Sequence, residues 1–146
     1  MSMTGVQESG MTFPVEDTKT FFIEQSPFVS SLSGLQKCEF ATITNGAKIQ
    51  LVEAKTSFSK PDNSVDFEKN VGEIVGKYKD SLSVINAMLL RHPAESSIAP
   101  LKGINQKTTE YEFALVIKTL PVQGLPPVMD ALKSKMKPYL KLWNVE

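Results

Sequence analysis

The sequence predicts an α/β fold with a mixed sheet that has a central antiparallel hairpin and is flanked by two helices. Two segments rich in β-branched and apolar residues meet at Asn45-Gly46, a strong hairpin signal. Apolar residues then recur at spacings of three and four over 71–89, the period of a helix with one buried face. A short apolar run, 113–117, and a second amphipathic segment, 125–139, complete the alternation of strands and helices.

Length and charge narrow the class of protein. At 146 residues the chain fits one domain, and we expect a flexible or strap-like lead-in over 1–18 followed by a single domain over 19–146. Lys plus Arg and Asp plus Glu both total 16, so the net charge is zero. Binding to a nucleic acid or to an anionic membrane would therefore require a local patch of positive charge.

Cysteine, histidine and hydropathy exclude further classes. The single cysteine, Cys38, and the single histidine, His92, exclude an internal disulfide and a cysteine- or histidine-rich metal site. Residues 1–11 lack the basic and apolar regions of a signal peptide, and no segment approaches the roughly 18 apolar residues of a spanning helix. We expect a cytoplasmic protein with no membrane partner.

Three strands are expected before the long helix. Residues 18–24 suit a short strand, because apolar residues stand together there before Ser26-Pro27 breaks the pattern. Segments 35–44 and 48–56 suit the two strands of the central hairpin.

The register of this hairpin decides which side chains share a face. A two-residue turn at 45–46 would set Glu39 opposite Val52, whereas a three-residue loop with Gly46 in the left-handed region would set Glu39 opposite Glu53. Asn-Gly itself favours the tighter turn, but the longer loop gathers apolar residues on one face, so we prefer it. The apolar pairs that it creates are Ile43 with Ile49 and Ala41 with Leu51.

A polar loop, 57–63, leads into the long helix. Asn63 or Ser64 can accept a backbone hydrogen bond as its cap. The helix should stop by Arg91, because Pro93 disfavours helix just before itself. The inward stripe is expected to contain Val71, Ile74, Val75, Tyr78, Leu82, Ile85, Met88 and Leu89.

The last elements are a strand and a helix. Residues 111–119 predict a strand of the kind that is buried on both faces inside a sheet. Residues 125–139 predict an amphipathic helix that Pro138 ends or bends. Residues 140–145 could then add an edge strand that carries Trp143. The inward positions of the helix are Val128, Leu132, Met136 and Leu140.

Glu53 and Lys55 stand out at the end of an otherwise apolar strand. Side chains two residues apart on a strand point to the same face, so these two project together. If Glu39 lies opposite, two carboxylates meet at hairpin distance and repel each other unless a hard cation or Lys55 lies between them. Oxygen ligands suit Mg²⁺ or Mn²⁺, and a metal-bound water could attack phosphorus while Lys55 positions it or offsets developing charge.

Glu39, and then Glu53-Ala54-Lys55, on consecutive strands followed by a helix and a strand, resembles the PD-(D/E)XK nuclease superfamily over roughly residues 19–119. The resemblance implies a nuclease-like domain with a restriction-endonuclease-like core of order αβββαβ, which hydrolyses phosphodiester bonds of DNA or RNA. It makes Glu39 and Glu53 ligands of Mg²⁺ or Mn²⁺ and Lys55 the catalytic lysine. Cys38-Glu39 stands where the superfamily has Pro-Asp, and Glu24 is the candidate for an early carboxylate that some members add.

The chain is also similar to a group of uncharacterised bacterial proteins. Their pattern is a Cys-Asp/Glu-Phe strand, a Val-Glu-Ala-Lys strand, a long helix, a Val-Ile-Lys strand, and a Pro-Pro helix that ends near a Trp. The matching residues here are Cys38-Glu39-Phe40, Val52-Glu53-Ala54-Lys55, Val116-Ile117-Lys118, and Pro126-Pro127 onward to Trp143.

Other functions fit the same residues. Zero net charge and the missing Pro-Asp pair favour a non-catalytic binding or assembly module on a nuclease-like scaffold. The apolar end, 140–145, could instead pair edge to edge with a second copy in a homodimer. Lys77 resembles a polar helix residue that some superfamily nucleases add to their sites, whereas Tyr78 falls in the apolar stripe. Lys133, Lys135, Lys137 and Lys141 could contact phosphates or form a solvated face.

Overall fold

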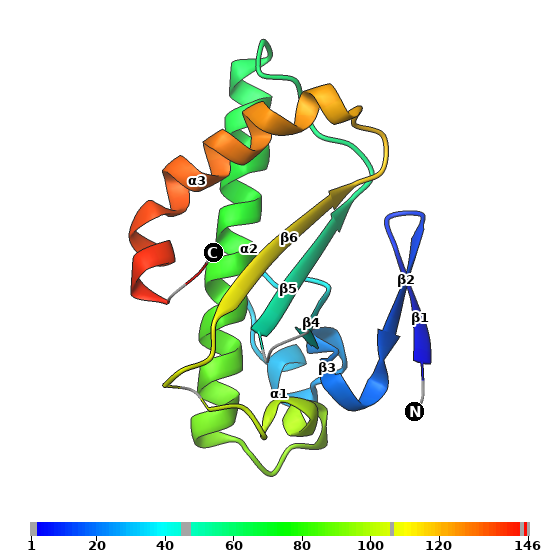
Figure 1. Cartoon of the computed structure of the whole chain (residues 1–146), viewed down its shortest axis with the longest axis vertical. Helices are drawn as coiled ribbons and strands as arrows, with labels where there is room; N and C mark the ends of the chain where they lie inside the picture. Colours follow the sequence, from blue (N-terminus) through cyan, green and yellow to red (C-terminus); the bar gives the residue numbers. More distant parts are fainter. Residues whose placement is uncertain (1–2, 45–47, 106, 144, 146) are drawn as a thin grey trace.

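The computed structural model describes residues 3–44, 48–105, 107–143 and 145, and it has a mixed α/β architecture (Figure 1). One sheet is a two-stranded antiparallel hairpin, and the other is a four-stranded mixed sheet of order β3-β4-β5-β6. The strands are β1 (Met3–Glu8), β2 (Met11–Glu16), β3 (Thr20–Phe21), β4 (Phe40–Thr44), β5 (Lys48–Lys55) and β6 (Tyr111–Ile117).

Three α-helices and four short 3-10 helices connect and cover these strands. Within the described residues, no helix combines the length and the apolar character needed to cross a membrane. The α-helices are α1 (Pro27–Ser30), α2 (Ser64–Arg91) and α3 (Leu125–Leu142), and the 3-10 helices are Asp17–Lys19, Ile23–Gln25, Ser96–Leu101 and Val122–Gly124.

The register of the central hairpin is the one that a three-residue loop produces. Ile43 pairs with Ile49 and Ala41 with Leu51. The predicted apolar stripe is therefore confirmed. The loop itself, 45–47, with its predicted left-handed Gly46, lies outside the described residues.

Helix α2 is the longest element and carries the chain from the end of β5 to the start of β6, so these two strands run parallel. Its predicted bounds are confirmed, and six residues of the predicted stripe are fully buried. The predicted side-chain cap is absent at Asn63, whose amide instead donates to the carboxylate of Asp66 at 2.9 Å. The buried stripe comprises Val71, Ile74, Tyr78, Leu82, Ile85 and Met88.

The larger sheet is covered on both faces. Ile49 and Leu51 of β5 join the apolar stripe of α2 and part of α3 in the main core. On the other face, Phe40 and Val52 pack against Val15 of β2 in a smaller cluster. The helices thus lie on one side of the sheet and the β1–β2 hairpin on the other (Figure 1).

This hairpin occupies a segment in which the sequence indicated no regular structure. Its turn, Ser9-Gly10, has positive φ at both residues, 51° and 73°, as the tight turn preferred by twisted hairpins requires. The Ser9 hydroxyl donates to the carbonyl of Ala54 at 3.0 Å, which ties the turn to the end of β5. The positive φ favours glycine at position 10, and the side chain of Lys118 lies over it.

The first predicted strands are shorter than expected. Only Thr20–Phe21 of the segment 18–24 is a strand, and 3-10 turns flank it. Strand β4 begins at Phe40 and not at 35, because the backbone at Gln36 and Cys38 bonds to side chains of α2 and not to another strand. The N–H groups of Gln36 and Cys38 donate to Asp80 and to Ser81 of that helix.

The C-terminal predictions need two corrections. Strand β6 forms an edge of the four described strands, and of its residues only Tyr111 is fully buried, so it is not buried on both faces. Helix α3 continues through Pro138 to Leu142, so the predicted edge strand over 140–145 is wrong. Helix α3, which contains Pro138, curves over its last turns (Figure 1). Val145 makes an isolated parallel bridge to Tyr111.

Candidate active site

A polar hollow of about 450 Å³ opens at the C-terminal end of β5. Four parts of the fold meet there: the turn of the β1–β2 hairpin, the start of β4, the end of β5 with its following loop, and α2. The side chains and backbone that line it belong to Ser9, Glu39, Glu53, Ala54, Lys55, Thr56, Ser57, Ser59, Asn70 and Lys77.

Glu53 is the buried charge of this site. It lies two residues after Leu51 on β5, so the strand's alternation turns it toward α2, and it is 0% exposed. Its Oε1 accepts a hydrogen bond from Nζ of Lys77 at 2.7 Å in a salt bridge. Its Oε2 is buried and has no hydrogen-bond partner in the part of the chain that the structure describes. This oxygen can be satisfied by the carboxyl of Glu39 when that group is protonated, or by a further ligand.

Glu39 provides the second carboxylate, immediately before β4. Its backbone N–H donates to the carbonyl of Val52 at 2.9 Å, which holds it beside the end of β5. Burial, the charge of Glu53 and a hydrogen bond with Glu8 raise the pKa of Glu39 to about 8. Burial raises the pKa of Glu53, and the hydrogen bond and charge of Lys77 lower it in part. Without a cation, the coupled pair of Glu39 and Glu53 therefore keeps a proton at neutral pH.

Two further carboxylates reach Glu39. One oxygen from each of Glu8, Glu24 and Glu39 lies within 4.8 Å of the other two. Glu8 ends β1, and Glu24 lies in the 3-10 helix Ile23–Gln25. Such a gathering of like charges is repulsive unless protons or cations offset it.

Lys55 lies at the rim of the hollow, at the last position of β5. Its amine is 3.6 Å from a carboxylate oxygen of Glu73 on α2 and 5.9 Å from the ring centre of Phe58. These contacts hold the amine on the same face as Glu53 while its side chain stays 22% exposed. The loop after β5 is fixed in turn, because Asn70 accepts the backbone N–H of Ser59 at 2.9 Å.

The structure brings the three predicted site residues, Glu39, Glu53 and Lys55, to one hollow. Lys77, singled out on the long helix, lies in the site, whereas Tyr78 is buried as core. Cys38 is buried as a small apolar side chain, and burial raises its pKa far above the ordinary value.

The sequence does not point to Glu8 or Ser9, because the expected lead-in over 1–18 shows no pattern typical of a site. The one available signal was Ser9-Gly10, a dipeptide of the kind found in tight turns, between two short strands. The sequence gives only a weak signal that those two strands pair, and it gives no signal that their hairpin packs on the larger sheet.

Comparisons with models of protein families, with curated proteins and with solved structures found nothing that matches this chain.

The donor set fits a hard divalent cation. The acidic side chains offer oxygen ligands, and neither His92 nor Cys38 lines the hollow. One buried oxygen of Glu53 has no partner among the residues that the structure describes. Mg²⁺ and Mn²⁺ prefer such ligands and keep several waters of their own, for which the hollow has room. A cation would also replace the proton that Glu39 otherwise holds.

We expect the proton on Glu39 to make stability depend on pH. Its pKa rises from an ordinary 4.5 to about 8 on folding. Between these values the folded protein keeps a proton that the unfolded chain has lost, so the free energy of unfolding should fall as pH rises from about 4.5 to about 8. Urea unfolding at pH 5 and pH 8 should show this fall in the wild type and a smaller one in Glu39→Gln. Equal pH dependence of the two proteins would contradict it, and Glu68→Gln, an exposed carboxylate on α2, serves as the control.

The Lys77–Glu53 pair gives a second prediction. Lys77→Met should lower the free energy of unfolding by about 3 kcal/mol, because it leaves a buried carboxylate without its cation. Adding Glu53→Gln should recover at least half of that loss, since the charge that needed the partner is gone. Chemical unfolding of both variants and of the exposed control Lys69→Met measures this. Simple additivity of the two substitutions would show that the pair is not coupled.

Proposed function

We propose that the chain is a divalent-metal-dependent, nuclease-like phosphodiester hydrolase of the PD-(D/E)XK type, acting on DNA or RNA. The observation that carries the proposal is the meeting of Glu39, Glu53 and Lys55 around one hollow, with the Oε2 of buried Glu53 unpartnered among the described residues. A carboxylate taken out of water with a free oxygen is costly unless something binds it.

The order of elements supports a restriction-endonuclease-like core. Strands β3, β4 and β5 pair antiparallel in succession, α2 follows, and β6 returns parallel to β5, which corresponds to the βββαβ part of the superfamily order. The opening helix has no counterpart before β3 among the described residues, where the β1–β2 hairpin stands instead. The β1–β2 hairpin carries Glu8, so replacing the opening helix of the superfamily by this hairpin also adds a carboxylate beside the site.

Glu53 and Glu39 would hold the metal, with Glu8 and Glu24 as further oxygen donors on the outer side. The ion, Mg²⁺ or Mn²⁺, supplies a Lewis acid for the phosphate and an acidified water. Lys77 favours the ionised form of Glu53 against the effect of burial and holds its side chain through the 2.7 Å contact. Its role is that of a positioning residue.

Lys55 would meet the substrate. Its amine lies on the face that Glu53 occupies and is partly exposed, so it can donate to a phosphate oxygen and offset the charge that develops there. Glu73 draws this amine toward α2 in the free protein. A phosphate in the hollow would compete with Glu73 for it. The buried thiol of Cys38 is compatible with the cytoplasm, where we place the protein.

A non-catalytic module is the second candidate, and the Lys77–Glu53 salt bridge is the observation that favours it. Lys77 already neutralises one carboxylate, and a proton on Glu39 neutralises the other. The pair of Glu39 and Glu53 is therefore neutralised without a metal. On this alternative the hollow is a structural or binding feature of a scaffold without turnover.

Calorimetry with Mn²⁺ separates a metal site from a satisfied cluster. We expect the wild type to bind Mn²⁺ and Glu53→Gln to bind at least about tenfold more weakly, because the variant lacks the charge that the cation needs. Glu68→Gln should bind as the wild type does. Absence of binding by the wild type would favour the scaffold.

Hydrolysis then separates an enzyme from a binder. With Mn²⁺ and mixed single- and double-stranded nucleic acids, Lys55→Met should lower the cleavage rate by about a hundredfold while leaving Mn²⁺ affinity nearly unchanged. Lys69→Met is the matched control. A Lys55→Met variant as active as the wild type would refute the role of this lysine, and metal binding with no cleavage would assign the site to binding alone.

A further inference from the structure

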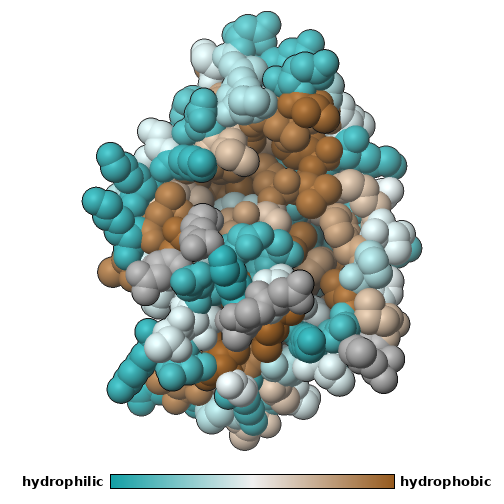
Figure 2. Space-filling view, in the orientation of Figure 1, coloured by the Kyte–Doolittle hydropathy of each residue, from teal (hydrophilic) through white to brown (hydrophobic). Residues whose placement is uncertain are grey.

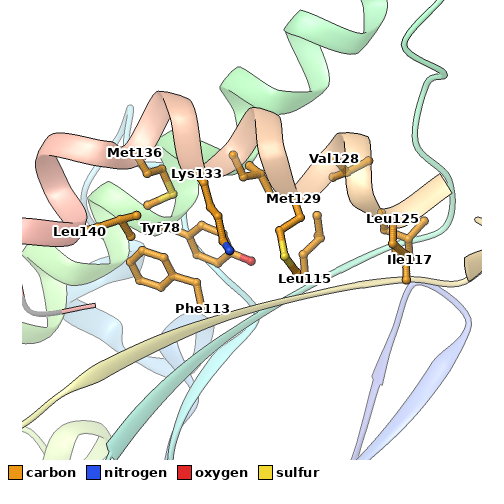
Figure 3. A pocket seen from close by; sticks show the side chains of 11 residues that line it. Tyr78, Phe113, Leu115, Ile117, Leu125, Val128, Met129, Lys133, Met136 and Leu140 are labelled. Atoms are coloured by element: carbon orange, nitrogen blue, oxygen red, sulfur yellow. The ribbon is translucent and has the colours of Figure 1, made fainter. Parts of the chain in front are cut away.

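A second hollow, of about 260 Å³, lies between α3 and β6, on a different part of the molecule from the acidic site (Figure 3). Eleven residues line it, and nine of them are apolar. The two polar groups come from Tyr78 of α2 and Lys133 of α3. This hollow, which we call the α3–β6 groove, plays no part in the proposed hydrolysis.

The groove is open at the surface. Leu125 and Met129 of α3 are 38% and 55% exposed, and β6 lies at the edge of the described sheet. Apolar surface gathers over the first turns of α3 and the end of β6 (Figure 2). Open apolar area of this kind, next to a cavity, is typical of a site that takes an apolar ligand.

Tyr78 has an unsatisfied hydroxyl in the wall of this groove. Its side chain is 1% exposed, and its hydroxyl has no hydrogen-bond partner within the described residues. Its ring stacks on Phe113, with the centroids 4.4 Å apart and the planes 3° from parallel, so the hydroxyl cannot swing away without breaking the stack. Burial raises the pKa of Tyr78 well above its ordinary value, which keeps the hydroxyl protonated and able to donate.

Lys133 adds a positive charge to the same place. Its side chain reaches from α3 into the groove toward Tyr78 (Figure 3). A phenol oxygen can accept from an ammonium, but its own O–H still needs an acceptor, which an ammonium cannot supply. A carboxylate satisfies both, because it has two acceptor oxygens and a negative charge.

We propose that the α3–β6 groove binds an amphipathic carboxylate, in the form of a medium-chain fatty acid. Its carboxylate would accept from Tyr78 and pair with Lys133, and its chain would lie against apolar side chains such as Leu115, Met129 and Leu132. The volume suits about eight to ten carbons, since a methylene occupies roughly the space of one water, about 30 Å³. Because the hydroxyl of Tyr78 is buried and needs an acceptor, the groove should bind a fatty acid more tightly than an alkane of the same length.

Calorimetry with decanoate tests the proposal. We expect saturable one-to-one binding by the wild type, and weakening of about tenfold or more in Tyr78→Phe and in Lys133→Met. Both substitutions keep the apolar part of the side chain, so a merely structural role would not produce a loss of this kind. Lys137→Met, an exposed lysine of the same helix that does not line the groove, should bind as the wild type does.

Two other ligands complete the test. Decanol lacks the charge and acetate lacks the chain, so each should bind at least about tenfold more weakly than decanoate. Absence of decanoate binding, or equal binding by wild type, Tyr78→Phe and Lys133→Met, would overturn the proposal. Sedimentation that shows a dimer dissociated by Met129→Lys, together with no decanoate binding, would assign the groove to a second copy of the chain instead.

Discussion

The buried salt bridge between Lys77 and Glu53 is the constraint on which the site depends. Side chains of β5 point alternately to the two faces of the sheet, and Glu53 points to the face that α2 covers. Lys77 of α2 lies beside it and provides the positive charge that this buried carboxylate needs. A carboxylate at 0% exposure without a partner would cost several kcal/mol. The ion pair therefore fixes how α2 lies on the sheet, and with it the position of Tyr78, the next residue along the helix. The acidic hollow and the α3–β6 groove are set by one stretch of α2.

The chemistry of the acidic hollow follows from what this ion pair leaves unsatisfied. Lys77 contacts one oxygen of Glu53, and the other remains buried and unpartnered among the described residues. Glu39, with a pKa raised to about 8, holds a proton at neutral pH that a divalent cation can displace. The pair of Glu39 and Glu53 can therefore be neutralised either by a proton or by a metal ion. The first state suits an inert scaffold and the second a metal-dependent enzyme, which is why both functions fit this site.

The local parts of this account could be predicted from sequence, and the long-range parts could not. The hairpin register followed from pairing Ile43 with Ile49, and it brought Glu39 and Glu53 together. The partner of Glu53 could not be known, because a polar residue on a helix shows its partner only when the rotation of that helix against the sheet is fixed. The position of Ser9 beside Ala54 likewise depends on how one hairpin docks on another sheet. The sequence left open whether Pro138 ends or bends α3, and the helix continues past it to Leu142.

The most direct test of the central claim is diffraction from crystals grown with Mn²⁺, recorded where manganese scatters anomalously. The account predicts one strong anomalous peak in the acidic hollow, within coordination distance of Oε2 of Glu53 and of a carboxylate oxygen of Glu39, about 2.0–2.3 Å. The same experiment locates any water or ion elsewhere in the hollow. Crystals with full Mn²⁺ occupancy at other sites and none at Glu53, or with Oε2 bonded to a protein donor, would contradict the claim that this carboxylate is a metal ligand.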